Sequence, residues 1–329
     1  MSVVHPRIAT HSGSFHADDV FGVAVLAALH PQHEIVRTRE PREVAAADFA
    51  VDVGGEWDPG RGRFDHHQRG FDGARVRVDA SGATVRAEGY ASAGLVWREF
   101  GASYVRQVAQ RMGYTLAEEK IAQVVQDVDA SLVRYLDLVD TGAQVVSPGV
   151  AGLSSQLALL NSTWLEEQGL DGAGKAQLQM ERFGEAMAMM QRLLERLVLR
   201  RIGQELAADK VRASERLLGG RVLYLAEGGM PWTSVVVDEM PQVLLVLYPE
   251  SDEGGQRFVL RTAPAGKDTF ASRIDLPKAW GGLREGQLAA ACGVPDALFC
   301  HTNLFIAVAR SFAGALRMAE AALFGSGPA

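Results

Sequence analysis

The stretch RIATHSGSFHADDVFGVAVLAAL, residues 7–29, decides how the amino-terminal part of the chain folds. Its first residues, Arg7–His11, are typical of a short strand, and Ser12–Ser14 is a turn of small residues. Ala17–Leu29 is an apolar segment with two acids in its first turn, where the helix dipole favours negative charge. The stretch therefore predicts a strand, a turn and a helix in succession.

Strand and helix patterns continue to alternate over the next residues. Glu34–Thr38 and Phe49–Val53 are typical of strands, and Pro41–Ala47 is typical of a short helix between them. Such alternation indicates a parallel sheet covered by helices. Gly70–Gly89 is polar and weakly patterned, so we expect a long loop there. Further helices are expected at 92–112, 117–140 and 149–160.

The second half of the chain has a different pattern. Lys175–Leu218 carries apolar residues at helical spacing and is either one long helix or two helices broken near Gly203. Beyond it we expect strands at 221–226, 243–248 and 257–261 and helices at 283–292 and 311–323. The chain is therefore predicted to be an α/β protein with a mainly parallel sheet in its amino-terminal domain, a long helical connector and a smaller α/β carboxyl-terminal domain. The predicted bounds of these three parts are 1–170, 171–220 and 221–329.

The composition excludes several classes of protein. Of the 329 residues, 47% are hydrophobic and 22% are charged, which is typical of a globular chain and not of a disordered one. The net charge of -7 argues against sequence-independent duplex binding, which needs a positive face, although a local basic cleft is compatible with it. Two cysteines, Cys292 and Cys300, are too few for a disulfide framework. No apolar run approaches about 18 residues, so we expect a cytoplasmic protein with no membrane partner.

The histidines are unevenly distributed along the chain. Seven of the eight lie within the first 67 residues, at positions His5, His11, His16, His30, His33, His66 and His67. Aspartates at Asp18, Asp19, Asp52 and Asp65 share this stretch. Imidazole and carboxylate are the usual ligands of catalytic transition metals, so the clustering indicates a metal site.

Four short elements carry the candidate ligands. They are His11, His16 and Asp18 in the first strand, turn and helix; Asp52 in V-D-V-G-G; Asp65, His66 and His67 in R-F-D-H-H; and Asp140 in L-V-D-T-G. Each element alone has an ordinary explanation, such as a hydrogen-bonded surface histidine or a solvated helix-end acid. If one histidine of the His66-His67 pair meets substrate and Asp65 hydrogen-bonds a ring nitrogen, the four elements still supply three histidines and three aspartates as metal ligands. That number is enough to hold two divalent ions, with Asp52 bridging them.

These motifs resemble the DHH phosphoesterase superfamily, and more closely the melanocyte-proliferating-gene family, also labelled metal-dependent protein hydrolases. The first group of matching stretches is THSGSFHADD (10–19), EIVRTREP (34–41), VDVGGEWDP (51–59), RFDHHQRGF (63–71) and SAGLVWREFG (92–101). The others are VDTG (139–142), LNSTW (160–164), FASRIDLPKAWGGLR (270–284) and ALFCHTNLFI (297–306). The resemblance runs along nearly the whole chain, and it implies a DHH-type amino-terminal domain.

The resemblance also implies a ligand set. One metal is expected at His11, His16 and Asp52, with His16 in the place where the wider superfamily commonly has an aspartate. The second metal is expected to bind Asp18, Asp52, His66 and Asp140. His67 is expected to face the phosphate of the substrate, while Asp65 hydrogen-bonds a histidine ring and fixes its tautomer. The catalytic residues are thus predicted to be Asp18, Asp52, Asp65, His66 and His67.

The family is linked to 3′–5′ RNA exonuclease activity, and the superfamily to pyrophosphatases, single-strand exonucleases and cyclic-dinucleotide phosphodiesterases. The chain departs from its relatives at one place. They usually carry a glycine pair after Phe305-Ile306, where this chain has Ala307-Val308-Ala309-Arg310. Side chains there replace bare backbone that would approach an anion. We expect the change to affect the identity and affinity of the substrate.

Basic side chains near the motifs are candidates for substrate binding, because arginine grips phosphate in a bidentate manner. Those of the amino-terminal part are Arg37, Arg39 and Arg69, and those of the carboxyl-terminal part are Arg273, Arg284 and His301, with Lys278 beside them. Trp280 is a candidate for base stacking, although core packing explains it equally well. A surface role without substrate remains the alternative for the arginines.

Two metal ions about 3.5–4 Å apart hold a bridging water and lower its pKa, so that hydroxide attacks phosphorus without a side-chain nucleophile. The mixed imidazole and carboxylate ligands favour Mn²⁺, with Mg²⁺, Co²⁺ or Zn²⁺ as alternatives. The ligand set predicts a metal-dependent hydrolase that acts on phosphoester bonds, and the family resemblance implies that it is a 3′–5′ exonuclease on single-stranded RNA.

Two other hypotheses stay open. In the first, the same chemistry acts on dinucleotides, pyrophosphate or other small phosphate esters, as the altered 307–310 segment and the acidic net charge suggest. In the second, the chain is a non-hydrolytic, metal-containing nucleic-acid-binding protein. The apolar helices at 92–112 and 175–218 are also compatible with a homodimer interface, although core helices have the same pattern.

Overall fold

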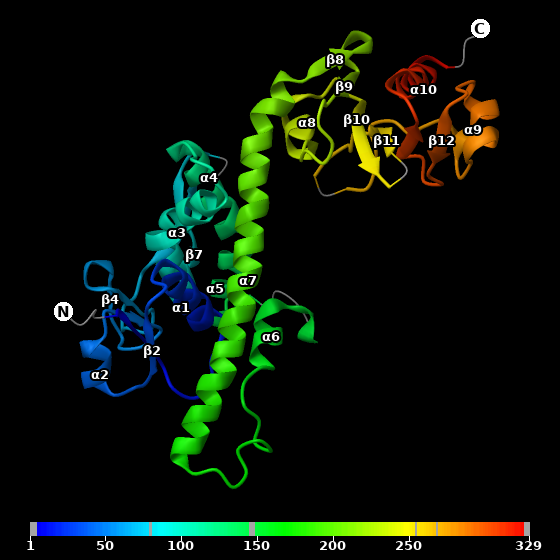
Figure 1. Ribbon diagram of the computed structural model, residues 1–329. Coiled ribbons are helices and arrows are strands. Elements are labelled where there is room, and N and C mark those ends of the chain that lie inside the picture. Colours follow the sequence, from blue (N-terminus) through cyan, green and yellow to red (C-terminus); the bar gives the residue numbers. More distant parts are fainter. Residues whose placement is uncertain (1–4, 79–80, 145–148, 254, 268, 326–329) are drawn as a thin grey trace. The chain divides into compact units, whose positions relative to one another are not determined.

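The fold is described from a computed structural model of residues 5–78, 81–144, 149–253, 255–267 and 269–325 (Figure 1). The chain forms two compact units, Met1–Ile202 and Gly203–Ala329, and we describe each by itself. Both units combine helices with sheets, so the predicted mixed α/β class is confirmed. The finer division into 1–170, 171–220 and 221–329 stays a prediction.

The first unit is built on a five-stranded sheet with the order β2-β1-β3-β5-β4. Its strands are β1 (Arg7–Thr10), β2 (Glu34–Arg37), β3 (Phe49–Val51), β4 (Trp57–Asp58) and β5 (Arg63–Phe64). The central strand β1 pairs in parallel with β2 and β3, and β3 pairs in parallel with β5. Only β4 runs antiparallel, against β5. The mainly parallel sheet expected from the alternating pattern is therefore present.

The first unit also contains helices. They are α1 (Ala17–Leu29), α2 (Pro41–Ala46), α3 (Ser92–Arg111), α4 (Glu118–Val128), a π-helix (Asp129–Val133), α5 (Arg134–Asp140), α6 (Leu153–Ala158) and the start of α7 (Gly172–Ala213); short 3₁₀ turns lie at Pro59–Arg61 and Gly149–Ala151. Of these helices, α1, α2 and α3 contact the five-stranded sheet. The central helix α1 is buried from Ala17 to Ala27, as its apolar residues on all faces require. It packs mainly against α3.

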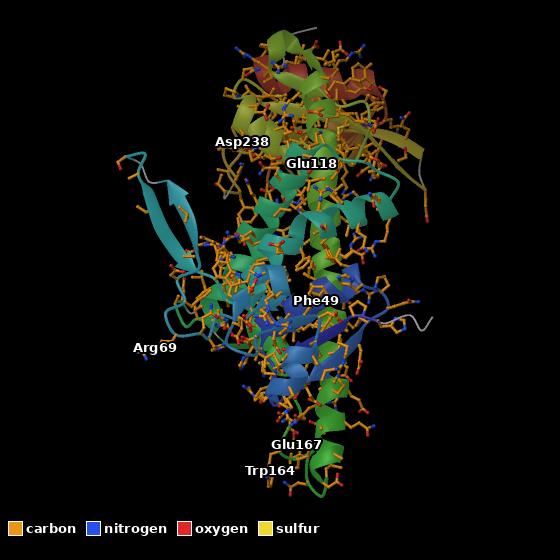
Figure 2. The ribbon with its side chains drawn as sticks, turned by 90° about the vertical axis from the view of Figure 1, so that its left-hand side faces the viewer. Phe49, Arg69, Glu118, Trp164, Glu167 and Asp238 are labelled. Carbon is orange, nitrogen blue, oxygen red and sulfur yellow. The ribbon has the colours of Figure 1, made fainter. Side chains whose placement is uncertain are left out.

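The prediction of a long loop at 70–89 is wrong. The structure places an antiparallel hairpin there, formed by β6 (Ala74–Val78) and β7 (Thr84–Gly89). Figure 2 shows it in cyan, projecting from the rest of the unit. The alternation of valine and arginine in Ala74–Val78 is the two-residue period of a strand, but the short polar segment around it hid the signal.

Arg75 fastens this hairpin to the helices. Its guanidinium donates to both oxygens of Asp129, at 2.8 and 2.5 Å, and to Oδ2 of Asp137 at 2.6 Å. Asp137 is fully buried and also accepts a bond of 2.9 Å from the backbone N–H of Gly94 in the first turn of α3. A side chain at Gly94 would meet the Asp137 carboxylate, so only glycine lets α3 and α5 approach this closely. The network fixes α5, which ends at Asp140.

The second unit contains a six-stranded sheet with the order β12-β13-β11-β10-β9-β8. Its elements are β8 (Glu215–Leu217), β9 (Val222–Tyr224), α8 (Thr233–Glu239), β10 (Leu245–Asp252), β11 (Gly255–Thr262), α9 (Glu285–Cys292), β12 (Ala297–Cys300), β13 (Ile306–Ala309) and α10 (Phe312–Phe324), with 3₁₀ turns at Leu218–Gly220 and Lys278–Trp280. The expected strands and helices are confirmed with shifted ends. Helix α8 and strands β12 and β13 were not predicted, and β8 lies where the helix expected at 175–218 was predicted to end.

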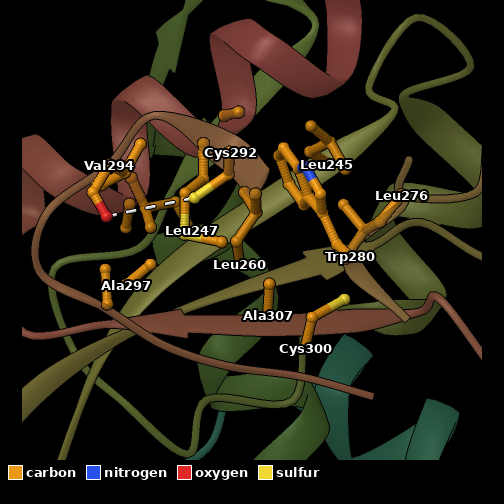
Figure 3. Packing of buried hydrophobic residues seen from close by; sticks show 14 of the residues in the cluster. Leu245, Leu247, Leu260, Leu276, Trp280, Cys292, Val294, Ala297, Cys300 and Ala307 are labelled. Atoms are coloured by element: carbon orange, nitrogen blue, oxygen red, sulfur yellow. Dashed lines mark hydrogen bonds between the residues drawn. The ribbon is translucent and has the colours of Figure 1, made fainter. Parts of the chain in front are cut away.

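The two faces of this sheet have different partners. On one face, strand residues such as Leu245, Leu260 and Ala307 pack with α9 and α10 in a core around Trp280 and Cys300 (Figure 3). On the other face, Leu223 and Val246 pack with α8 and the end of α7. Trp280 is 1% exposed, so its predicted base-stacking role is wrong and core packing explains it.

The helix α7 runs from Gly172 to Ala213 without interruption, so the break considered near Gly203 is absent. Gly203 lies in an open position, and glycine within a helix is tolerated at a modest cost. Within the described residues, no helix has the length and apolar character needed to cross a membrane. A homodimer through 92–112 and 175–218 stays a prediction.

The Arg75 network predicts an asymmetric effect of two arginine substitutions. Arg75→Ala leaves buried Asp137 without its cation, which is expected to lower the free energy of unfolding by about 3–5 kcal/mol. Arg106→Ala removes a solvent-exposed pair with Glu118 and should cost at most about 1 kcal/mol. Urea denaturation of both variants measures the difference. Equal losses would show that the Arg75 contacts do not anchor the hairpin.

Candidate metal centre

The four predicted elements meet at one edge of the parallel sheet of the first unit. His11 follows β1, Asp52 follows β3, and Asp65 follows β5. Because β1, β3 and β5 are parallel, their carboxyl ends lie at the same edge, which is where ligands bind in open α/β sheets. The N-terminus of α1 and the C-terminus of α5 bring His16 and Asp140 to the same place.

Asp52 is the centre of this cluster. Its carboxylate is 3% exposed, and its oxygens lie 3.4 Å from Nε2 of His11, 3.5 Å from Nδ1 of His66 and 3.2 Å from Nδ1 of His67. The backbone of Asp52 has a φ of 56°, in the left-handed region that non-glycine residues rarely adopt. Such strain often marks a functional site. Here it turns the carboxylate into the cluster directly after the strand.

His66 links Asp52 to Asp140. Its Nε2 lies 3.2 Å from Oδ2 of Asp140, and its Nδ1 lies 3.2 Å from Oγ of Ser92. The Ser92 hydroxyl also donates to Oδ1 of Asp52 at 3.1 Å. Nδ1 of His16 lies 3.9 Å from Oδ1 of Asp140, and the His16 side chain is 60% exposed. His16 therefore stands at the mouth of the cluster and His66 in its interior.

Asp18 is the least satisfied group of the site. It is 1% exposed, and neither of its carboxylate oxygens has a hydrogen-bond partner. Nε2 of His11 is buried and likewise without a hydrogen bond, although it lies 3.3 Å from Asp19. Buried carboxylates are normally paired or bound to metal, because desolvation of an unpaired charge is costly. These unpartnered oxygen and nitrogen atoms fit a divalent cation bound within the cluster.

Three overlapping groups of side chains have donor atoms close enough together to share an ion. They are His11 with His16 and Asp52; His16 with Asp18 and Asp140; and Asp52 with Asp65, His66 and His67. The first is the predicted set for one metal. The predicted second set, Asp18, Asp52, His66 and Asp140, is divided between the other two groups and joined by the contacts of His66. The roles of these residues stay predictions.

Burial and neighbouring charges shift the pKa values of several side chains in the cluster. Burial, with the charges of Asp52 and Asp140, raises the pKa of Asp18 well above its ordinary value. Burial also raises the pKa of Asp52, but its close contacts with His11 and His67 outweigh burial and lower the pKa. The bond to Asp52 is the largest cause that raises the pKa of His67 to about 9. The neighbouring carboxylates thus favour the neutral form of Asp18 and the protonated form of His67.

Two supporting residues were missed from the sequence. Asp19 accepts a bond of 2.8 Å from the backbone N–H of His16 and one of 3.4 Å from the hydroxyl of Thr10, while its other contact is His11. Asp19 therefore holds the turn of the first motif in place. Ser92 begins α3 and orients Asp52 and His66. The acid pair Asp18-Asp19 was a visible signal, but Ser92 reaches the site only through tertiary packing.

The predicted arginines of the first unit have different environments. Arg37 donates to the carbonyls of Gly13 and Gln179, at 2.5 and 3.1 Å, and stacks 4.9 Å from the ring of Phe183. Its guanidinium therefore holds the first turn against α7. Arg39 lies two residues after the end of β2, is exposed, and donates to the carbonyl of Ser12. Arg69 is exposed, and Figure 2 shows it at the outer edge of the unit.

The residues of the second unit that were predicted to bind substrate also have different environments. The guanidinium of Arg273 donates to four backbone carbonyls at the C-terminus of α8 and the following turn, so it caps that helix. Arg284 and Lys278 are exposed, and Arg284 stacks over the ring of Phe299 at 4.7 Å. Nδ1 of His301 accepts a bond from the backbone N–H of Asn303 at 3.0 Å.

The segment that replaces the glycine pair is strand β13. Ala307 and Ala309 are fully buried in the core with α9 and α10, while Val308 points to the opposite face. On that face, this chain therefore differs from a chain with a glycine pair only by the Val308 side chain, which is 8% exposed. The expected effect on substrate identity stays a prediction.

Comparisons with known proteins agree with the resemblance seen in the motifs. The model of an uncharacterised protein family (UPF0160) matches residues 7–323. The human protein named MYG1 exonuclease is 32% identical over 340 residues, covering 97% of this chain and 86% of its own length. A Caenorhabditis elegans MYG1 protein is 31% identical and covers 96% of this chain and 94% of its own length.

Among solved structures, the chain matches a pGpG-specific phosphodiesterase, PggH, from Vibrio cholerae. The match covers 97% of both chains, with 14% sequence identity and a TM-score of 0.29. A TM-score this low assigns neither a fold nor a function to the chain.

The contacts of Ser92 predict a change in metal affinity. Ser92→Ala removes the hydroxyl that orients Asp52 and His66, and loss of such a supporting bond typically weakens metal binding about 10–100-fold. Titration calorimetry with Mn²⁺ measures the dissociation constant. Ser131→Ala, which removes an exposed hydroxyl of the π-helix, is the matched control and should leave it unchanged. Identical affinities in both variants would show that Ser92 does not support the site.

Proposed function

The chain belongs to the MYG1 exonuclease family (UPF0160), and on that premise we propose that it is a divalent-metal-dependent phosphoesterase. The reaction that we propose for it is 3′–5′ exonuclease action on single-stranded RNA. The relatives whose names describe an activity are called exonucleases, and the resemblance of the motifs to the DHH superfamily points to the same bond type. The first unit is then a DHH-type catalytic domain.

One observation carries the proposal. Asp18 is buried with both oxygens unpartnered, next to the carboxylates of Asp52 and Asp140 and within a ring of histidines. A protein without a cation at this point would bury several like charges at a large cost in stability. The arrangement is therefore best understood as a ligand set for divalent cations.

The residues that would hold the cations are His11, His16, Asp18, Asp52, His66 and Asp140. When bound, such ions polarise the phosphoryl group and generate hydroxide from water at neutral pH. Their mixed imidazole and carboxylate ligands favour Mn²⁺, because Mg²⁺ prefers shells of oxygen only.

In this proposal His67 meets the substrate, and its contacts support that role. Its Nδ1 lies 2.9 Å from Oδ1 of Asp65, and the same oxygen accepts the backbone N–H of His67 at 2.9 Å. The other oxygen of Asp65 accepts the N–H of Gly55 at 2.6 Å, so the carboxylate is held firmly. With Nδ1 engaged, Nε2 of the exposed imidazole is the nitrogen that remains for a phosphate at the mouth of the cluster.

The proposal predicts that purified protein with Mn²⁺ shortens an oligoribonucleotide labelled at its 5′ end, and that excess EDTA stops the reaction. Asp52→Asn removes the charge at the centre of the cluster and should lower the rate at least about 100-fold, since metal ions supply several kcal/mol of transition-state stabilisation. Product ladders on sequencing gels give the rates. Asp72→Asn, an exposed acid outside the cluster, serves as the control.

The outcomes separate the three hypotheses. Undiminished activity of Asp52→Asn would contradict the catalytic assignment. Equal rates on two-nucleotide and twelve-nucleotide substrates would favour the dinucleotide or small phosphate-ester alternative. Metal-loaded protein that binds RNA but hydrolyses no phosphoester would favour the non-hydrolytic binding protein.

A further inference from the structure

One residue far along the chain holds the backbone immediately before His16. Oδ1 of Asn161 accepts a hydrogen bond of 2.8 Å from the backbone N–H of Phe15. Nδ2 of Asn161 donates a hydrogen bond of 3.0 Å to the backbone carbonyl of the same residue. Asn161 lies in the LNSTW motif, shortly after α6, and is 146 positions away from Phe15. A single side-chain amide therefore pairs with both polar backbone groups of Phe15, as a neighbouring strand would.

The segment 11–16, which we call the histidine turn, depends on such distant partners. It has no regular secondary structure of its own. Side chains from outside the turn bond its backbone; they are Asn161, Arg37, Arg39 and Asp19. Because backbone groups out of water need partners, loss of such a side chain releases the turn from this conformation.

His16 is a candidate ligand whose placement depends on its backbone. Its side chain is 60% exposed, and its Nδ1 lies 3.9 Å from Oδ1 of Asp140, which is longer than a hydrogen bond. His16 nevertheless belongs to two of the three groups of side chains that could share an ion. Its imidazole reaches those partners only if the backbone directs it toward them. That direction is set by Phe15 on one side and, on the other, by Asp19, which accepts the His16 N–H at 2.8 Å.

Asn161 is itself held in place by α6 and α7. Its Nδ2 also donates to the carbonyl of Ala158, the last residue of α6, at 3.2 Å. The next residue, Ser162, donates to Oε1 of Glu167 at 2.7 Å, and the same oxygen accepts a bond of 3.0 Å from Nε2 of Gln179 in α7. Asn161 therefore holds the histidine turn at a fixed position relative to two helices.

We propose that Asn161 is a positioning residue of the metal centre, which fixes the backbone before His16 and thereby presents the His16 imidazole to a divalent cation. The inference rests on the proposed function, because His16 is a metal ligand there. The buried ring of Phe15 packs against Phe183 of α7, with ring centroids 5.6 Å apart, which holds the turn near α7 but leaves its backbone free to rotate. The side-chain amide of Asn161 removes that freedom, because its donor and acceptor lie in one plane.

Titration calorimetry of the full-length protein with Mn²⁺ tests the role of Asn161. Asn161→Leu removes the amide at nearly constant volume and should weaken manganese binding about 10–100-fold, as loss of a supporting bond typically does. His16→Ala should also weaken manganese binding. Adding Asn161→Leu to His16→Ala should then cause no further loss, because Asn161 acts through His16.

Gln191→Leu is the matched control. Nε2 of Gln191, in α7, donates to the carbonyl of Ala24 in α1 at 3.3 Å. The variant therefore also removes an amide that joins distant parts of the unit, but away from the histidine turn. It should bind manganese as the parent does, even if thermal unfolding shows a loss of stability like that of Asn161→Leu. Asn161→Ser, which leaves space for water, should show the same loss of affinity if Asn161→Leu does not fold.

Two kinds of result would overturn the proposal. Equal losses caused by Asn161→Leu in the parent and in His16→Ala would do so, since the effect would then not pass through His16. Unchanged affinity in Asn161→Leu and Asn161→Ser, or an equal loss in Gln191→Leu, would show that the amide does not position a metal ligand.

Hydrolysis measured separately distinguishes this proposal from the proposed function. The predicted affinity losses with no hydrolysis of any phosphoester by the parent would support the role of Asn161 and overturn the proposed activity. Hydrolysis by the parent with unchanged manganese affinity in Asn161→Leu would overturn the role of Asn161 alone. A parent protein that takes up no manganese would overturn both.

Discussion

The stability of the first unit depends on how the charges of its buried carboxylates are balanced. Asp18, Asp19 and Asp52 lie almost fully out of water within one small region, and Asp18 has no hydrogen-bond partner. Like charges in a medium of low dielectric repel each other and lose their hydration. The free energy of unfolding is therefore lowered unless cations balance the negative charge. The histidines supply part of that compensation through their contacts with Asp52. A divalent cation bound at this point would supply the rest, and this charge balance is the physical basis of the metal proposal.

The surrounding architecture serves to keep these charges together. Parallel pairing brings the ends of β1, β3 and β5 to one edge, and α3 supports that edge from its first turn. There Ser92 bonds Asp52 and His66, while the N–H of Gly94 and the guanidinium of Arg75 hold Asp137. Asp137 lies one turn before the C-terminus of α5, where Asp140 meets His66.

The sequence predicted those parts of the protein that depend on local pattern. Helix α1 was bounded correctly at Ala17 and Leu29, because its apolar residues and its acidic first turn are both visible in the chain. The candidate ligands were recognisable because short motifs place them directly after strands. The features that the sequence did not predict depend on contacts between residues far apart in the chain. Nothing local shows that Arg273 satisfies carbonyls of α8, that Trp280 is a core residue, or that Ser92 bonds Asp52. The hairpin at 74–89 was missed because its stability comes from Arg75 and distant aspartates.

Anomalous scattering from crystals soaked in Mn²⁺ tests the metal account most directly, since it locates the ions without reference to activity. The account predicts strong anomalous peaks within bonding distance of Asp18 and Asp52, with His11 and His66 turned toward them. It is contradicted if the pocket shows no peak while the carboxylate of Asp18 stays buried and unpartnered, or if manganese is found only at exposed acids elsewhere on the chain.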